Sequence, residues 1–409
     1  MFSSHLVSLL YGLYALPALA TVTTRADGCN LPANYSTIDT RSLPNPWRFS
    51  DGRPVTTAAD FSCRQAEMSQ ILQRFELGDF PPPPDALTAT LNGTTMKLSI
   101  QVGNHTKLVT ATITPPANGE IPTGGSPAFV ALGGLSIPLH PSVGKIIFAN
   151  DACAEQSGQS SRGKGWFFDL HGGRSHSAGA LLAWAWCAGR IIDGLEQLGA
   201  SQTGIDHQKL GVSGCSRNGK GALVVGAFER RFALTVPQES GAGGTACWRI
   251  LDDEASKAPR RFEPGMGGPP TAESVVADSV WFSRRWEAYA RKVGVVPADH
   301  HFLAAMIAPR GLLVLENNID WLSPVGTTGC MKAARAIYGE LGVKMNMGFS
   351  LMGGHGHCQF PNATAADLES FVDRFLLGTV GRANDVEVSP VAVSSSWWSS
   401  WSAAPNITL

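Results

Sequence analysis

The chain has 409 residues, of which 16% are charged, and its formal net charge is −1 at pH 7. This near-neutral balance excludes a nucleic-acid-binding protein, and no amphipathic cationic stretch indicates attachment to a membrane surface. After the N-terminal segment, no uncharged apolar run reaches the roughly 18 residues that would indicate a membrane span.

The first 20 residues have the features of a secretory signal peptide. An apolar run is broken by Pro17, and Ala18-Leu19-Ala20 has the A-x-A form of a cleavage site. We therefore expect a secreted, extracellular protein in which residues 21–379 form a single catalytic domain. Five N-x-S/T sequons are candidate glycosylation sites in a secreted chain, and they lie at Asn34, Asn92, Asn104, Asn362 and Asn406.

Helix-like and strand-like segments alternate along the chain. Helices are expected at 63–75, 177–198 and 365–377, and strands at 97–102, 108–113, 128–132, 209–213, 232–237, 311–316 and 347–352. This alternation predicts an α/β fold with a mostly parallel sheet in a three-layer αβα sandwich. Residues 252–275 are charged and rich in Gly and Pro, which predicts an insertion loop. Residues 380–409 lose periodicity and hold Trp397, Trp398 and Trp401 in a Ser-rich stretch, which predicts a disordered tail.

The segment from Leu210 to Val225 is the strongest functional signal. An apolar strand leads into a glycine turn with Ser216 at its tip, and small residues and a helix follow. A serine on a sharp strand-to-helix turn is the nucleophile elbow of the α/β-hydrolase fold. The pattern departs from G-x-S-x-G, because Asn218 occupies the second glycine position and Gly219 comes one residue later. We predict that Ser216 is a nucleophile.

A catalytic serine needs a base and an acid that orients the base. In this fold the base follows the last strand, where His355 and His357 both occur. Cys215 directly precedes Ser216 and Cys358 directly follows His357, and a disulfide between them would bring their Cα atoms within about 4.4–6.8 Å. Such a bridge favours His357.

The acid and the oxyanion hole are less sharply defined. Glu239 follows the strand at 232–237 and Asp320 follows the strand at 311–316, so both are candidates for the acid. The backbone N–H of Arg217 is expected in the oxyanion hole, and its guanidinium adds positive charge. Gly133-Gly134 is a candidate for the facing loop.

The eight cysteines predict disulfides. They lie at 29, 63, 153, 187, 215, 247, 330 and 358, and none forms a C-x-x-C motif that would indicate zinc binding or redox chemistry. In a secreted chain we expect them to be bridged. Apart from the favoured 215–358 bridge, the 105 pairings of eight cysteines cannot be ranked from spacing.

The segment Gly214–Ala222 resembles the elbow of the fungal 4-O-methyl-glucuronoyl methylesterases, the glucuronoyl esterases of carbohydrate esterase family 15. Further similar segments extend over nearly the whole mature chain, and they are 63–67, 133–138, 175–181, 281–283, 299–301, 319–322 and 357–361. The resemblance implies an α/β-hydrolase that cleaves esters of glucuronic acid.

The resemblance also implies roles for individual residues. Ser216 would be the nucleophile, Glu239 the acid and His357 the base, with Arg217 helping to stabilise the oxyanion. The family's disulfide pattern would pair 29 with 63, 215 with 358, and 247 with 330. Residues 153 and 187 depart from that pattern, and they either pair with each other or remain buried and reduced.

The resemblance assigns sugar binding to Lys220 and Trp321. Two further family positions, a Gln and a Glu, align here with Pro270 and Asp278. Asp278 keeps a hydrogen-bond acceptor on a shorter side chain, whereas Pro270 has no side-chain donor, so one sugar contact is expected to be lost or moved.

Taken together, these features predict a secreted serine esterase that needs no metal or cofactor and acts as a monomer. It would hydrolyse esters between 4-O-methyl-D-glucuronic acid side chains of glucuronoxylan and lignin alcohols through an acyl-enzyme. Two alternatives are an acetyl or feruloyl xylan esterase and a catalytically inactive carbohydrate-binding hydrolase fold.

Overall fold

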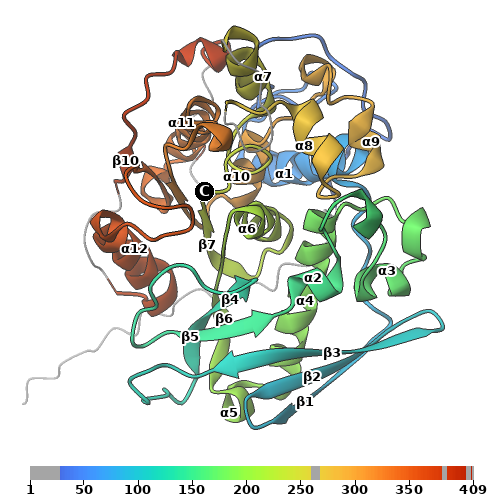
Figure 1. Ribbon diagram of the computed structural model, residues 1–409, viewed down its shortest axis with the longest axis vertical. Helices are drawn as coiled ribbons and strands as arrows, with labels where there is room; N and C mark the ends of the chain where they lie inside the picture. The colour runs from blue at the N-terminus through green and yellow to red at the C-terminus, as the bar shows by residue number, and fades with distance from the viewer. Residues whose placement is uncertain (1–27, 259–267, 380–384, 402–406, 408–409) are drawn as a thin grey trace, which may run out of the picture.

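The computed structural model describes residues 28–258, 268–379, 385–401 and 407. The proposed signal peptide and the sequon at Asn406 lie outside these ranges. The described chain is built around one ten-stranded sheet (Figure 1) with the strand order β1-β2-β3-β5-β4-β6-β7-β8-β9-β10. The strands are β1 (Ala86–Asn92), β2 (Thr95–Val102), β3 (His105–Thr114), β4 (Ser126–Leu132), β5 (Gly144–Phe148), β6 (Ile205–Cys215), β7 (Phe232–Gln238), β8 (Gly311–Glu316), β9 (Met347–Leu351) and β10 (Glu387–Val388).

The sheet is mostly parallel, as the alternation of strands and helices predicts. Pairs from β4 and β5 through β9 and β10 are parallel, and only β1, β2 and β3 bring antiparallel pairings. All seven expected strands are present. Strand β1 was missed although Leu87, Ala89 and Leu91 alternate with Thr88, Thr90 and Asn92, a pattern typical of a strand. Strand β5 was missed because it has only five residues.

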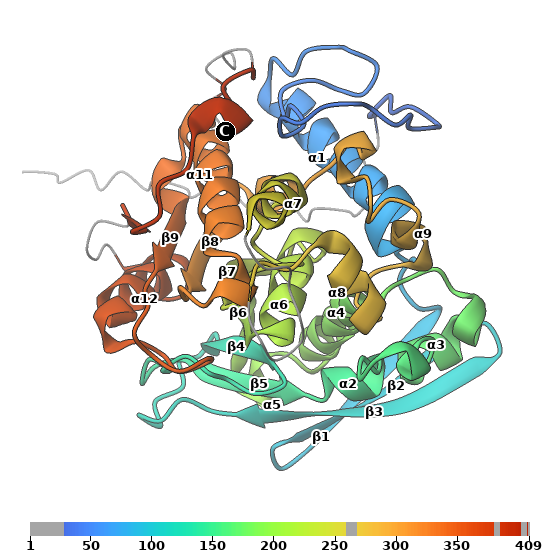
Figure 2. The same ribbon diagram turned by 45° about the horizontal axis from the view of Figure 1, so that its top comes forward.

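Helices cover both faces of the sheet (Figure 2). The helices are α1 (Ala58–Leu72), α2 (Asn150–Cys153), α3 (Trp166–Leu170), α4 (Ala180–Leu198), α5 (Ala200–Thr203), α6 (Arg217–Phe228), α7 (Trp248–Lys257), α8 (Ala272–Asp278), α9 (Arg284–Glu287), α10 (His301–Ile307), α11 (Pro324–Glu340) and α12 (Ala365–Val372). Alternate strand residues point to opposite faces. On β8, Leu312 and Val314 join the larger core cluster, whereas Leu313 and Leu315 join the cluster that α12 covers. This arrangement confirms the three-layer α/β-hydrolase fold.

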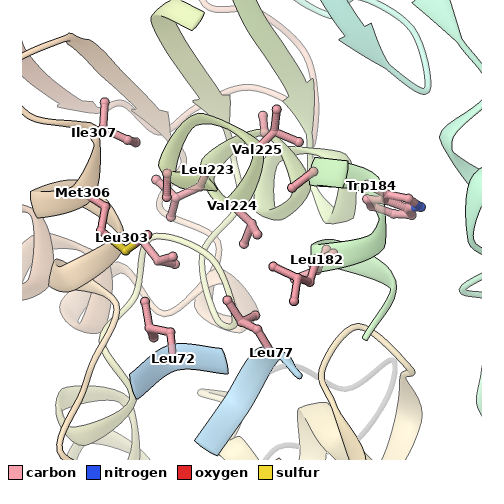
Figure 3. Packing of buried hydrophobic residues seen from close by; sticks show 14 of the residues in the cluster. Leu72, Leu77, Leu182, Trp184, Leu223, Val224, Val225, Leu303, Met306 and Ile307 are labelled. Carbon is pink, nitrogen blue, oxygen red and sulfur yellow. The ribbon is translucent and has the colours of Figure 1, made fainter. Parts of the chain in front are cut away.

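Helix α6 lies at the centre of the larger core (Figure 3), where Leu223, Val224 and Val225 are almost completely buried. Around them pack Leu182 and Trp184 of α4, the α10 side chains, and apolar residues of α1 and its continuation. Each large apolar side chain buried in this way contributes about 1.5–3 kcal/mol. The helix that begins directly after Ser216 is therefore rigidly held.

One predicted segment is wrong over its described residues, and a second is wrong at its two ends. Residues 385–401 are not a disordered tail, because β10 pairs with β9 and Trp401 Nε1 donates a hydrogen bond of 2.9 Å to Leu43 O. The three tryptophans are partly buried and pack against the core. This packing stabilises the segment although its sequence has no helix or strand periodicity. The expected insertion loop at 252–275 holds the end of α7 and the start of α8, and 259–267 lie outside the described residues. The charged residues Asp252, Asp253, Glu254 and Lys257 form the polar end of α7, whose buried apolar residues precede the window.

Within the described ranges, no helix is long and apolar enough to cross a membrane.

Candidate active site

Ser216 occupies the sharp turn between β6 and α6. Its backbone has φ 60° and ψ −125°, a region that non-glycine residues rarely adopt and that costs about 1–3 kcal/mol. The turn is tight because a Cβ on Gly214 would lie 2.6 Å from Asn218 O, and one on Gly219 would lie 2.4 Å from Gln238 O. Gly219 is therefore required by the neighbouring strand β7, which explains why the second glycine of the elbow comes one residue late.

His357 and Glu239 form a close pair beside this turn. His357 Nδ1 lies 2.7 Å from Glu239 Oε2, and the backbone N–H of Cys358 donates to the same oxygen at 2.9 Å. Glu239 directly follows β7 and is 1% exposed. An imidazole whose Nδ1–H donates to a carboxylate presents Nε2 as a hydrogen-bond acceptor. The pair has the geometry of a base oriented by an acid.

The two alternatives from the sequence lie elsewhere. His355 Nε2 faces Met352 O at 2.9 Å, and its Nδ1 is 3.6 Å from Glu239 Oε1, which is too long for a hydrogen bond. Asp320 is exposed on η5 (Asp320–Leu322). Across the described ranges, no hydrogen bond or ion pair joins Asp320 to either histidine. The structure brings His357 together with Glu239.

All eight cysteines are paired. Cys215 and Cys358 are bridged with their Cα atoms 5.7 Å apart, so the serine turn and the histidine loop are covalently joined. The pairs 29–63 and 247–330 agree with the family pattern, and the two departing cysteines, 153 and 187, are bonded to each other. A ring nitrogen of His357 and the sulfurs of Cys215 and Cys358 lie within 4.8 Å of one another. These sulfurs are bonded to each other and offer no thiolate for a metal.

The elbow faces the loop that begins at Gly133. A Cβ on Gly133 would lie 2.1 Å from Asn218 Nδ2, so this loop lies directly against the Asn218 side chain in the first turn of α6. Ser136 Oγ, on the same loop, donates to Gln238 Oε1 at 2.6 Å. Arg217 begins α6 and is exposed. Backbone N–H groups at such a helix start can face a developing oxyanion.

Lys220 lies one helical turn after Ser216, and its backbone N–H donates to Ser216 O at 3.0 Å. Only 5% of its surface is exposed. Its ammonium donates a hydrogen bond to Ser240 O and lies 5.2 Å from the centre of the Trp281 ring. Burial lowers the pKa of Lys220 to about 8, while the negative charge of Glu316 acts in the opposite direction. The lysine is therefore a buried cation with few neighbours to compensate it.

The other three positions that align with sugar-binding residues of the family are Trp321, Asp278 and Pro270, and they differ in burial and in their contacts with His357. The Trp321 ring meets the His357 ring edge to face, with the centres 4.6 Å apart, so Trp321 lies next to the pair of His357 and Glu239. Asp278 is the exposed last residue of α8, and Pro270 is buried. Within the described part of the chain, no hydrogen bond connects Asp278 to the pair of His357 and Glu239.

Sequence reasoning missed Glu316 and Asn317, which stand at the end of β8. Asn317 Nδ2 donates to His355 O at 3.2 Å and lies 3.5 Å from Glu239 Oε2. Glu316 is almost completely buried beside the residues that follow Glu239. Their position was the available signal, because polar side chains at the carboxyl ends of parallel strands commonly serve the site of an α/β protein.

Comparisons with known proteins agree with this geometry. A family model described as fungal glucuronyl esterase matches residues 98–342. The chain is 48% identical over 384 residues to a 4-O-methyl-glucuronoyl methylesterase of Thermothelomyces thermophilus, covering 94% of this chain and 93% of the relative. It is 49% identical over 373 residues to one of Neurospora crassa, covering 91% of each.

Solved structures of high similarity carry the same description. The glucuronoyl esterase of Sporotrichum thermophile, solved as an alanine mutant with methyl 4-O-methyl-β-D-glucopyranuronate, has a TM-score of 0.86 and 48% identity, covering 92% of this chain and 99% of that one. The glucuronoyl esterase catalytic domain of Hypocrea jecorina has a TM-score of 0.86 and 44% identity over the same shares. The chain therefore belongs to the fungal glucuronoyl esterase family and is a carboxylic ester hydrolase.

Proposed function

We propose that this protein is a secreted esterase that separates lignin alcohols from the 4-O-methyl-D-glucuronic acid side chains of glucuronoxylan, with Ser216, His357 and Glu239 as its catalytic triad. The observation that carries the proposal is the 2.7 Å contact between His357 and Glu239, held beside the strained serine turn by the Cys215–Cys358 bridge. Membership of the family supports the glucuronate ester as the substrate class.

The reaction follows from these positions. Ser216 Oγ attacks the ester carbonyl carbon and passes its proton to His357 Nε2, while the carboxylate of Glu239 stabilises the resulting imidazolium. The oxyanion is held by the backbone N–H of Arg217, with the exposed guanidinium adding positive charge. His357 then protonates the departing alkoxide, and an alcohol leaves. Water attacks the acyl-enzyme and gives a proton to His357, which passes it to the departing Ser216 Oγ as glucuronic acid is released.

Substrate recognition rests on Lys220 and Trp321. The Lys220 ammonium carries three N–H donors, and its bond to Ser240 O uses one of them, so donors remain for sugar hydroxyls. Trp321 adjoins His357 and offers a flat ring and an indole N–H to the glucuronate. Asp278 is a weaker candidate, since it is exposed at the end of α8.

The proposal includes secretion, with cleavage after Ala20, and a monomer that needs neither metal nor cofactor. Four disulfides agree with an oxidising compartment. The sequons at Asn34, Asn92, Asn104 and Asn362 all place an exposed asparagine at the surface, as glycan attachment requires.

The deciding experiment compares hydrolysis of benzyl glucuronate with hydrolysis of benzyl acetate. We expect turnover of the glucuronate ester and little turnover of the acetate. The variants Ser216→Ala and His357→Ala should abolish turnover while unfolding at the same denaturant concentration as the wild type. Preference for acetate or feruloyl esters would favour a different cell-wall esterase, and binding of glucuronoxylan without any turnover would indicate an inactive sugar-binding fold.

A further inference from the structure

Ser240, the buried residue directly after Glu239, is hydrogen-bonded at both ends of its backbone to charged side chains. Its N–H donates to Glu316 Oε1 at 2.8 Å, and its Oγ reaches the same oxygen at 3.0 Å. Its carbonyl oxygen accepts the bond from the Lys220 ammonium. One residue therefore joins an anion on β8 to a cation on α6.

Glu316 is fully enclosed, with 3% of its surface exposed. Its Oε1 also accepts a hydrogen bond of 3.0 Å from Gly241 N and one of 2.5 Å from Thr245 Oγ1. Among the residues that the structure describes, its Oε2 has no hydrogen-bond partner. Burial raises the pKa of Glu316, and the hydrogen bonds from Thr245, Gly241 and Ser240, all neutral groups, act in the opposite direction and favour the carboxylate. A buried carboxylate is costly unless a nearby positive charge compensates it.

Lys220 likewise needs a nearby charge of opposite sign, because its ammonium is buried. Burial lowers its pKa, the nearby Arg217 guanidinium lowers it further, and Glu316 is the negative charge that raises it. The Trp281 ring on its other side offers only the weaker attraction of an aromatic face. Without Glu316 the ammonium would lose the charge that favours its protonated form.

We infer that Glu316 is a positioning residue that keeps Lys220 fixed and positively charged, through Ser240, so that Lys220 can bind the sugar. The inference deepens the proposed function and rests on it, because it takes Lys220 as a glucuronate ligand. Glu316 does not touch the substrate in this arrangement. It holds the turn after Glu239 through Ser240 N and Gly241 N, and that same turn presents the carbonyl oxygen that orients Lys220.

The test is Glu316→Gln, which removes the charge but keeps the shape and an acceptor oxygen for Ser240 and Gly241. We expect KM for benzyl glucuronate to rise roughly tenfold, in line with the loss of a charge-assisted interaction, and most of the loss in kcat/KM to come from KM. The wild-type KM should rise as the pH passes about 8, where Lys220 loses its proton. In Glu316→Gln this rise should begin at lower pH. Ser216→Ala blanks correct for spontaneous ester hydrolysis.

A double-variant cycle separates this role from a general structural one. Lys220→Met should raise KM by itself, and adding Glu316→Gln to it should raise KM little further, because the charge then has nothing to support. Thr245→Val removes one hydrogen bond to Glu316 but leaves its charge, so it should change KM far less. Equal effects of Glu316→Gln with and without Lys220 would overturn the inference.

Two further outcomes distinguish a failure of this inference from a failure of the proposed function. If Lys220→Met leaves KM for the glucuronate ester unchanged, the sugar-binding role of Lys220 fails and the inference fails with it, although the esterase activity stands. If Glu316→Gln does not fold, Lys220→Arg replaces it, because arginine remains charged at every pH used. Its KM should not rise above pH 8, and a wild-type KM that is equally flat refutes the inference.

Discussion

Removing the Cys215–Cys358 bridge should damage catalysis beyond its cost in stability. The bridge joins the residue before Ser216 to the residue after His357, with a Cα separation of 5.7 Å. The perturbation is the double substitution Cys215→Ala with Cys358→Ala, which leaves no unpaired thiol. Without the bridge, the histidine loop depends on hydrogen bonds alone, among them those of Glu239 with His357 Nδ1 and Cys358 N and that of Asn317 with His355 O.

The stability cost follows from the length of chain that the bridge closes. The two cysteines are 143 residues apart, and the Cys247–Cys330 bridge, which spans 83 residues, lies inside that loop. The loop left to be closed is therefore about 60 residues. In the chain-entropy treatment, a loop of this size corresponds to about 4 kcal/mol of unfolding free energy at 25 °C.

The matched control is Cys29→Ala with Cys63→Ala. That bridge closes 34 residues, which also corresponds to about 4 kcal/mol, but it joins α1 to the preceding loop rather than two parts of the site. Both variants should lose a similar unfolding free energy in a denaturant titration. Only the variant at Cys215 and Cys358 should lose kcat, by about 100-fold, the scale expected when a reacting group is misplaced by about 1 Å.

Kinetics are measured well below the unfolding midpoints of both variants, on benzyl glucuronate. Equal kcat values for the two would refute the reasoning, because the bridge would then contribute stability alone. Mass spectrometry of an unreduced digest checks the premise, and a peptide that links Cys215 to any cysteine other than Cys358 would also refute it.

Three further outcomes are expected. Glu239→Ala should lower kcat by up to about 10⁴-fold, whereas the exposed Asp320 can be replaced by Ala with little loss, and the reverse order would place the acid on the later loop. Burial lowers the pKa of His300, but the charge and hydrogen bond of Glu76 outweigh it and leave the pKa raised. His300 should therefore stabilise the fold fully below about pH 6.5 and lose this contribution as the pH rises through its folded-state pKa; in His300→Gln this pH dependence should disappear from denaturant titrations. The secreted protein should begin after Ala20, as N-terminal sequencing would show.

Local patterns in the chain were sufficient to identify much of the fold. The strands that became β6, β7 and β8 were recognisable because buried parallel strands are short continuous apolar runs bounded by turn residues. The serine turn was recognisable because Gly214, Ser216 and Gly219 form a contiguous motif after an apolar strand, although the structural need for glycine at 219 comes from Gln238 O on β7. Both patterns lie within short segments of the chain, so they can be recognised from the sequence alone.

Other features depend on residues that are distant in the chain. Tail residues 385–401 were predicted to be disordered because the segment around Trp397 and Trp401 lacks periodicity. In the structure, Trp401 Nε1 donates to Leu43 O, 358 residues earlier in the chain, and the Trp401 ring stacks on the His301 ring. One local signal was not used in the sequence analysis. Helix α1 begins before the expected start because Thr57 and Asp60, three residues apart, form a reciprocal capping box that the sequence already shows.

The sequence by itself determined the fold class, the nucleophile turn and the family, because each depends on local apolar patterning or on a contiguous motif. It left Glu239 and Asp320 as equal candidates from position alone, and only the tertiary structure decided that the carboxylate of Glu239 meets His357. The pairing of Cys153 with Cys187 and the link from Glu316 through Ser240 to Lys220 were likewise decided there. Contacts of this kind depend on how strands and helices align across the sheet, and that alignment is set by the packing of the whole core rather than by any one segment.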